Sequence, residues 1–146
     1  MFRGSASTKI DEKGRLKVPT QFRRELEERH GPDVFITSIL GDSALVYPLR
    51  EWEQLEERLA ALPSTDRTRR RFLERVAYYG QLGRLDSQGR VIVPALLRES
   101  AAMSGEVVVS GRLDHLEVWN HERLRERFDA EPFSEDDFQY LSEKGV

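Results

Sequence analysis

One short pattern occurs twice in the chain and limits its possible folds more than any other feature. Residues 8–24 read TKIDEKGRLKVPTQFRR, and residues 82–98 read LGRLDSQGRVIVPALLR. The identical pairs at an offset of 75 residues include Asp11 and Asp86, Gly14 and Gly89, Arg15 and Arg90, Val18 and Val93, and Pro19 and Pro94. Because self-similarity of this kind indicates a repeated structural unit, we expect two copies of one small unit.

Each copy predicts a strand, a tight turn, a second strand and a short helix. In the first copy a strand ends at Ile10, and residues 11–14 favour a turn because Asp bonds to its own backbone and Gly accepts a positive φ. Residues 15–18 then alternate polar and apolar, as in a half-buried strand. Pro19 ends that strand and suits the first position of a helix. Asp11 and Gly14, like Asp86 and Gly89, are therefore expected to shape the turns.

Composition narrows the class of protein. The 146 residues include no cysteine, which excludes disulfides and suits a reducing cytoplasm. No segment resembles a signal peptide or a membrane span, so we expect a soluble, cytoplasmic chain with no membrane partner. The three histidines lack a metal-binding spacing and are expected in exposed turns, and no glycine-rich phosphate loop is present. We therefore expect no enzyme activity, no metal and no cofactor.

Charge is distributed unevenly along the chain, although the total is only −3. Residues 1–24 hold seven basic and two acidic side chains, a net charge of +5, and residues 82–98 hold three and one, a net charge of +2. The rest of the chain carries −10. Such a chain would present a basic face formed by the two copies on an acidic body, which favours contact with nucleic acid at that face.

The segments that follow each motif predict hairpins and helices. Residues 34–40 and 44–47 are expected to form a hairpin, and residues 51–62 a helix with Trp52 in the core. A similar order returns after residue 94, with Trp119 in the core and the offset between copies reduced from 75 to 72. The expected parts are a first unit at 1–50, a helical linker at 51–80, a second unit at 81–124 and a helical tail at 125–146.

Several stretches resemble the SpoVT/AbrB family of swapped-hairpin DNA-binding domains, and the tandem arrangement is similar to its MraZ members. The matching stretches are MFRG, IDEKGRLKVP, LVYP followed by EW, LDSQGRVIVP and GRLDHLEVW, in that order, over residues 1–128. Gln21 departs from the pattern, because that family usually has a basic residue there. The resemblance implies an α+β fold with two tandem AbrB-like units, a pseudo-twofold core, and linking and C-terminal helices.

The same resemblance implies a function. Members of this family are bacterial transcriptional regulators that assemble into rings and bind short direct repeats of double-stranded DNA. They repress their own operon, which belongs to the division and cell-wall gene cluster. For this chain we therefore expect a sequence-specific repressor that is associated with the nucleoid and forms a ring-shaped homo-oligomer.

Arg15 and Arg90 are the leading candidates for DNA contact, because guanidinium binds phosphate or a guanine edge bidentately. The alternative is that each arginine only pairs with the aspartate four residues earlier and staples its turn. Both roles are compatible if the aspartate orients the arginine. The remaining basic candidates suit phosphate contact or ordinary solvated surface, and they are Lys9, Lys13, Lys17, Arg3 and Arg23.

Two further features have competing interpretations. The arginines at 67 and 69–71 stand at a helix start, where positive charge is unfavourable. We expect them to contact the glutamates of the 51–62 helix or another subunit rather than DNA. The acidic tail from Glu131 would also suit an antitoxin-like protein-interaction module, which is the alternative to the DNA-binding function. Antitoxins usually carry one copy and a long disordered tail, whereas this tail is short and favours a helix.

Overall fold

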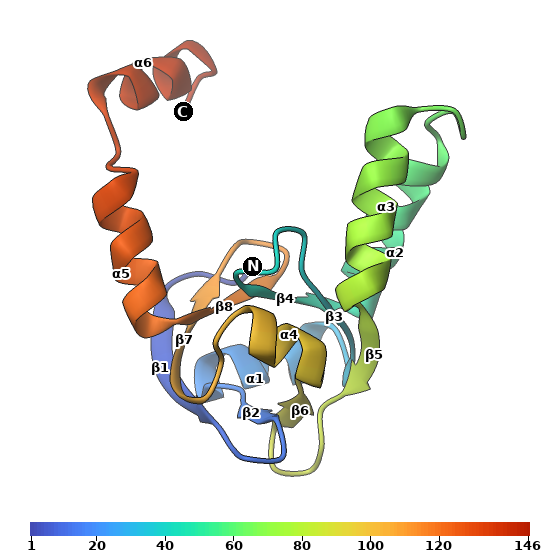
Figure 1. The fold of residues 1–146 in the computed structure, drawn as a ribbon, viewed down its shortest axis with the longest axis vertical. Helices are drawn as coiled ribbons and strands as arrows, with labels where there is room; N and C mark the ends of the chain where they lie inside the picture. Colours follow the sequence, from blue (N-terminus) through green and yellow to red (C-terminus); the bar gives the residue numbers. More distant parts are fainter.

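The computed structural model describes residues 1–146 as a mixed α/β fold with six helices and one eight-stranded antiparallel sheet. The strand order is β5-β3-β4-β8-β7-β1-β2-β6, and the sheet curls into a nearly closed barrel (Figure 1). The strands are β1 Ser5–Ile10, β2 Arg15–Lys17, β3 Asp33–Thr37, β4 Ala44–Pro48, β5 Gln81–Arg84, β6 Arg90–Ile92, β7 Gly105–Gly111 and β8 Leu116–Asn120. The helices are α1 Thr20–Arg29, α2 Leu49–Ala60, α3 Arg67–Tyr79, α4 Ala95–Ser100, α5 His121–Ala130 and α6 Glu135–Glu143.

Each copy of the repeat contributes a strand to the other copy. β1 of the first copy pairs along its whole length with β7 of the second, with Ser7 opposite Val108. β5 of the second copy pairs in turn with β3 of the first, with Val34 opposite Gly83. The two copies therefore share a single sheet.

Equivalent strands of the two copies pair with each other at two places in the sheet. β2 pairs with β6 around Leu16 and Val91, which are equivalent residues at the offset of 75. β4 pairs with β8 around Leu45 and Glu117, which are equivalent at the offset of 72. The offset falls by three between them, because α4 is four residues shorter than α1 and the loop after α4 (101–104) is one residue longer than the loop after α1 (30–32).

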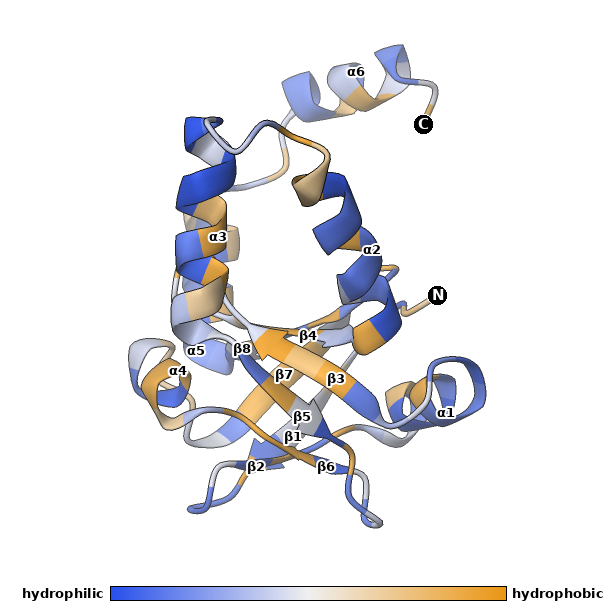
Figure 2. Ribbon diagram, turned by 90° about the vertical axis from the view of Figure 1, so that its right-hand side faces the viewer, coloured by the Kyte–Doolittle hydropathy of each residue, from blue (hydrophilic) through white to orange (hydrophobic).

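Equivalent apolar residues from both copies form one buried core. The first copy contributes side chains from the segment of β2 and α1 (residues 16–26), and the second contributes the matching ones from the segment of β6 and α4 (residues 91–101). These residues are Leu16, Val18, Phe22 and Leu26, and Val91, Val93, Leu97 and Ala101. Since α1 and α4 lie on opposite sides of the barrel (Figure 2), each helix covers a different part of the core with its apolar face.

The other helices form two arms that project from the side of the barrel away from the β1–β2 and β5–β6 turns (Figure 1). One arm holds α2 and α3, and the other holds α5 and α6. Trp52 anchors the first arm by stacking on Phe35, with ring centroids 4.7 Å apart. Trp119 lies under α5, with the Arg127 guanidinium 5.2 Å from its ring centroid. Both tryptophans are buried, which confirms the prediction that they belong to the core. Every helix is too short or too polar to cross a membrane.

Some predicted boundaries differ from the structure for local reasons. The first strand of the predicted 34–40 hairpin ends at Thr37, because the Ser38 hydroxyl accepts a hydrogen bond from the Gly41 amide and turns the chain. Pro19 and Pro94 lie one residue before their helices, at the cap, rather than at the first helical position. Their φ angles of −54° and −55° let the chain enter each helix directly.

Two predictions about charged and polar side chains were wrong in part, and the alternative that the α3 arginines contact another subunit stays a prediction. His30 and His115 lie at turns as expected, but both are half-buried: His30 stacks on Phe2, with ring centroids 5.4 Å apart, and His115 stacks on Tyr47 at 4.3 Å. His121 is exposed but begins α5. No ion pair joins the arginines of α3 to the glutamates of α2. Arg70 instead lies 3.7 Å from Glu74 within α3. The Asp66 carboxylate caps α3 by accepting from the Arg69 amide, which offsets the unfavourable charge at the helix start.

Candidate nucleic-acid interface

The turn from Asp11 to Arg15 is held by one aspartate. Asp11 Oδ1 accepts from the backbone amides of Lys13 at 3.0 Å and Arg15 at 2.9 Å. Asp11 Oδ2 accepts from Arg15 Nε at 2.6 Å, and the chain closes with the Gly14 amide bonded to the Asp11 carbonyl. The aspartate therefore shapes the turn and also fixes the direction of the arginine. The ion pair and the outward arginine are both present, as the sequence allowed.

The turn from Asp86 to Arg90 repeats this geometry. Asp86 Oδ1 accepts from the amides of Gln88 at 2.8 Å and Arg90 at 2.9 Å, and Oδ2 accepts from Arg90 Nε at 2.9 Å. The Gly89 amide bonds to the Asp86 carbonyl at 3.0 Å. Because Arg15 and Arg90 each use Nε for the aspartate, the terminal nitrogens of each guanidinium are left for another partner.

The carboxylates are stabilised in their charged form. The pKa of Asp11 is lowered by the hydrogen bond from the Arg15 amide first, and then by the Arg15 guanidinium and the Lys13 amide. The pKa of Asp86 is lowered in the same way, first by the Arg90 amide. Both aspartates therefore stay ionised and keep orienting their arginines at neutral pH.

Each turn is also bound to the opposite copy. The Val18 amide donates to the Gly89 carbonyl at 3.0 Å, and the equivalent Val93 amide donates to the Gly14 carbonyl at 2.9 Å. Gly14 and Gly89 have φ angles of +82° and +72°, a conformation that favours glycine. These reciprocal bonds hold the two turns at the two ends of the β2–β6 pair, and both turns lie on the side of the barrel away from the helical arms (Figure 2).

An arginine from the opposite copy lies against each of these glycines. Arg23 of α1 packs over Gly89 and donates from Nη2 to the Ser87 carbonyl at 3.0 Å. Arg98 of α4 packs over Gly14 and donates from Nε to the Val93 carbonyl at 3.0 Å. Arg98 was not among the predicted site residues, although its offset of 75 from Arg23 was a signal that could have identified it.

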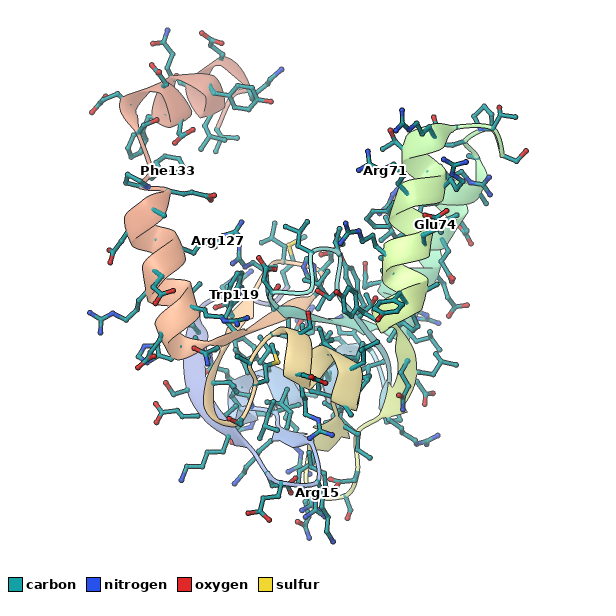
Figure 3. All side chains as sticks on the ribbon, viewed as in Figure 1. Arg15, Arg71, Glu74, Trp119, Arg127 and Phe133 are labelled. Carbon is teal, nitrogen blue, oxygen red and sulfur yellow. The ribbon has the colours of Figure 1, made fainter.

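The β2–β6 pair gives the site its outer face. Leu16 and Val91 point into the core, and their neighbours in each strand point outward because side chains alternate. Lys17 lies directly opposite Arg90 in this pair, so cations from both copies meet on one surface. Arg15 marks this surface at the end of the molecule farthest from the helical arms (Figure 3).

The structure brings some of the remaining candidates to this surface and not others. Lys13 is exposed at the tip of the first turn. Lys9 is exposed near the end of β1, with Glu106 opposite it on β7. Arg3 precedes the far end of β1, where its backbone lies against Gly111, so it is separated from the turns by the length of that strand. No group of three or more His, Cys, Asp or Glu side chains is arranged to hold a metal ion.

Comparison with known proteins identifies the relatives of the chain. A profile of the family described as "MraZ protein, putative antitoxin-like" matches residues 1–75 and 81–142. The chain is 47% identical over 146 residues to a protein of Acidobacterium capsulatum, with all of both chains covered. It is 48% identical over 147 residues to a protein of Koribacter versatilis, again over all of both chains, and 35% identical over 149 residues to one of Escherichia coli O127:H6, covering 99% of this chain and 96% of the relative. All three relatives are named Transcriptional regulator MraZ.

Proposed function

The chain belongs to the MraZ family, and from that membership we propose that it is a transcriptional regulator that binds double-stranded DNA. The face that would meet DNA is the outer side of the β2–β6 pair with its two flanking turns. The observation that carries this proposal is the convergence of Arg15, Lys17 and Arg90 from both copies on that face. The arginines, held by Asp11 and Asp86, would read a guanine edge or grip phosphate, and Lys13 and Lys17 would contact phosphate.

The roles of the other basic candidates follow from their places. Lys9, exposed on β1 beside the turn, would add a phosphate contact at the edge of the face. Arg23, bonded to the Ser87 carbonyl and to Glu27, would support the second turn. Arg3, at the far end of β1, would lie outside the contact.

The exchanged strands support an assignment of the two copies to the AbrB-like swapped-hairpin class. In this proposal the units are residues 1–50 and 81–124, joined by a helical linker at 51–80 and followed by a tail at 125–146. β1 and β5 are the exchanged elements, because each pairs with a strand of the other unit. Sequence specificity, repression of its own operon, regulation of the division and cell-wall cluster through direct repeats, and a cytoplasmic, nucleoid-associated location belong to the same proposal. These rest on the family resemblance alone.

The DNA-binding proposal is tested by fluorescence anisotropy with the DNA upstream of the chain's own gene and with a scrambled duplex. The wild type should prefer the upstream DNA and should bind less tightly at higher salt, because phosphate contacts release counterions. Arg15→Ala and Arg90→Ala should each lose affinity, on the order of tenfold for one bidentate contact. Equal, weak binding of all three proteins to both duplexes would refute the proposal.

We propose further that copies of the chain assemble head to tail into a ring, through the two helical arms. α6 begins with the acidic residues Glu135, Asp136 and Asp137, and α3 carries arginines of which only one has an ion pair. Exposed aromatic side chains also lie near the acidic residues of α6 and near the arginines of α3. Phe133 and Phe138 are both exposed, with ring centroids 4.7 Å apart, at the start of α6, and Tyr78 is exposed on α3. The arms differ and lie on opposite sides of the barrel (Figure 3), which suits a heterologous contact that closes into a ring.

Light scattering after size-exclusion chromatography tests this contact. The wild type should elute as a closed oligomer, whereas Arg71→Glu should dissociate it. Combining Arg71→Glu with Asp136→Arg should restore assembly by reversing the charge on both partners. A wild type that is monomeric, or an Arg71→Glu variant that assembles normally, would contradict the proposed arm contact. Co-purification of a monomeric wild type with a toxin-like protein would instead favour the antitoxin-like alternative.

A further inference from the structure

One side chain on the basic outer face is apolar. Ile92 is 54% exposed and lies directly opposite Arg15 in the β2–β6 pair. In the repeat it occupies the position of Lys17. The outward residues of the two paired strands, Arg15 and Lys17 in β2 and Arg90 and Ile92 in β6, therefore differ in chemistry between the copies only at this position.

The orientation of Ile92 is set by its strand. Val91 and Val93 on either side are 1% and 0% exposed and belong to the core, so alternation directs Ile92 outward. Arg15 is tied to Asp11 at 2.6 Å and is not free to fold over the isoleucine. Ile92 thus stays uncovered beside a guanidinium that the proposed function places against DNA.

An apolar side chain gains nothing from a phosphate, whereas the thymine 5-methyl group in the major groove is an apolar partner. We propose that Ile92 contacts a thymine methyl group, while Lys17 contacts a phosphate at the equivalent point of the other half. This inference rests on the proposed DNA-binding function and adds a specificity-determining residue to it. Because the two halves then recognise different DNA features, a bound site has a direction even though the backbone is nearly twofold.

A double-mutant cycle between protein and DNA tests the contact. Anisotropy is measured for wild type and Ile92→Ala on the upstream duplex, and on the same duplex with deoxyuridine replacing every thymidine. For one methyl contact the wild type should lose about fourfold in affinity on the deoxyuridine duplex. Ile92→Ala should lose a similar factor on the normal duplex and nothing further on the deoxyuridine duplex. Leu82→Ala, which removes a 66% exposed apolar side chain from β5, should behave like the wild type on both.

The outcomes separate this inference from the proposed function. If Ile92→Ala still discriminates thymidine from deoxyuridine as strongly as the wild type, the methyl contact is refuted while specific DNA binding stands. If the wild type does not distinguish upstream from scrambled DNA, both the proposed function and the methyl contact are refuted. Ile92→Lys makes the outward residues of β2 and β6 alike, and it guards against misfolding by keeping a long side chain. It should bind with a steeper salt dependence and without thymidine discrimination, and retained discrimination would overturn the proposal.

Discussion

The guanidinium group of Arg98 lies against Gly14 of the other repeat copy, so close that a Cβ atom on Gly14 would stand 2.6 Å from Arg98 Cζ. Arg23 has the same relation to Gly89, where a Cβ atom would stand 2.6 Å from Arg23 Cδ. Each helix that follows a motif therefore supports the turn of the opposite motif. The position of the basic face depends on both copies at once.

Replacing Gly14 by alanine tests this support. Gly14→Ala should destabilise the fold by about 1–2 kcal/mol for the left-handed backbone, with a further loss because Arg98 must move away from the Val93 carbonyl. Gly31→Ala is the matched control, since Gly31 has a φ of +90° and no atom within 4 Å of its Cβ position. Urea denaturation should show the larger loss for Gly14→Ala. Equal losses would mean that the arginine contact contributes nothing.

Asp11 is predicted to act on DNA binding through Arg15 and not by touching DNA. Asp11→Asn weakens the hydrogen bond to Arg15 Nε and also removes a negative charge from the basic face. Specific affinity should therefore fall several-fold while binding to scrambled DNA stays equal or rises, because less negative charge repels phosphate. Competition titrations with the two duplexes check this. A parallel fall on both duplexes would indicate simple unfolding of the turn.

The two turn aspartates predict a loss of stability in acid. Their pKa values in the fold lie below the ordinary value of 3.8, so their ionised forms stabilise the folded state above that pH. This contribution should disappear as the pH falls through the lowered pKa values. Thermal unfolding of the wild type and of the Asp11→Asn, Asp86→Asn double variant should give a gap in Tm that closes below pH 3.8. A gap that stays constant to pH 2 would contradict this account of the carboxylates.

Thr37 links the first helical arm to the barrel. Its buried Oγ1 donates to the Val76 carbonyl at 2.7 Å, where α3 approaches its end. Thr37→Val keeps the shape and leaves that carbonyl without its donor, so it should cost about 1–3 kcal/mol. Thr8→Val, which removes a similar 2.7 Å bond to the Lys17 carbonyl at an exposed site, should cost less in the same denaturation experiment. The reverse order would show that the arm is held by other contacts.

The elements that lie within the sequence repeat could be predicted, because residue patterns inside each copy indicate them. The positions of the two turns, the strands after them and the buried tryptophans followed from local patterns at Asp11, Asp86, Trp52 and Trp119. The exchange of β1 and β5 between copies had no local signal, because pairing partners in a sheet are set by long-range packing. It entered only through the family resemblance.

The individual turn residues of the site could be predicted from the sequence, but the contacts between the two copies could not. Asp and Gly at a fixed spacing predict the turn geometry, so Arg15 and Arg90 could be identified from the sequence. The contacts of Arg23 and Arg98 with the opposite turns join residues 64 positions or more apart, which no local pattern encodes. The expected ion pairs between the arginines of α3 and the glutamates of α2 are not formed. Two carboxylates next to or within α3 offset its positive charge instead, because Asp66 caps the helix and Glu74 pairs with Arg70.

The central claim is that the two turns meet DNA together, and site-directed DNA cleavage tests it most directly. The chain has no cysteine, so a single engineered one can carry an iron chelate at a unique position. Glu12→Cys and Gln88→Cys place the chelate on the exposed tips of the two turns, and Ser64→Cys places it between α2 and α3 as the control. We predict cleavage of the upstream duplex at neighbouring positions from both turn variants and none from the control. Cleavage from Ser64→Cys with none from either turn would contradict the account.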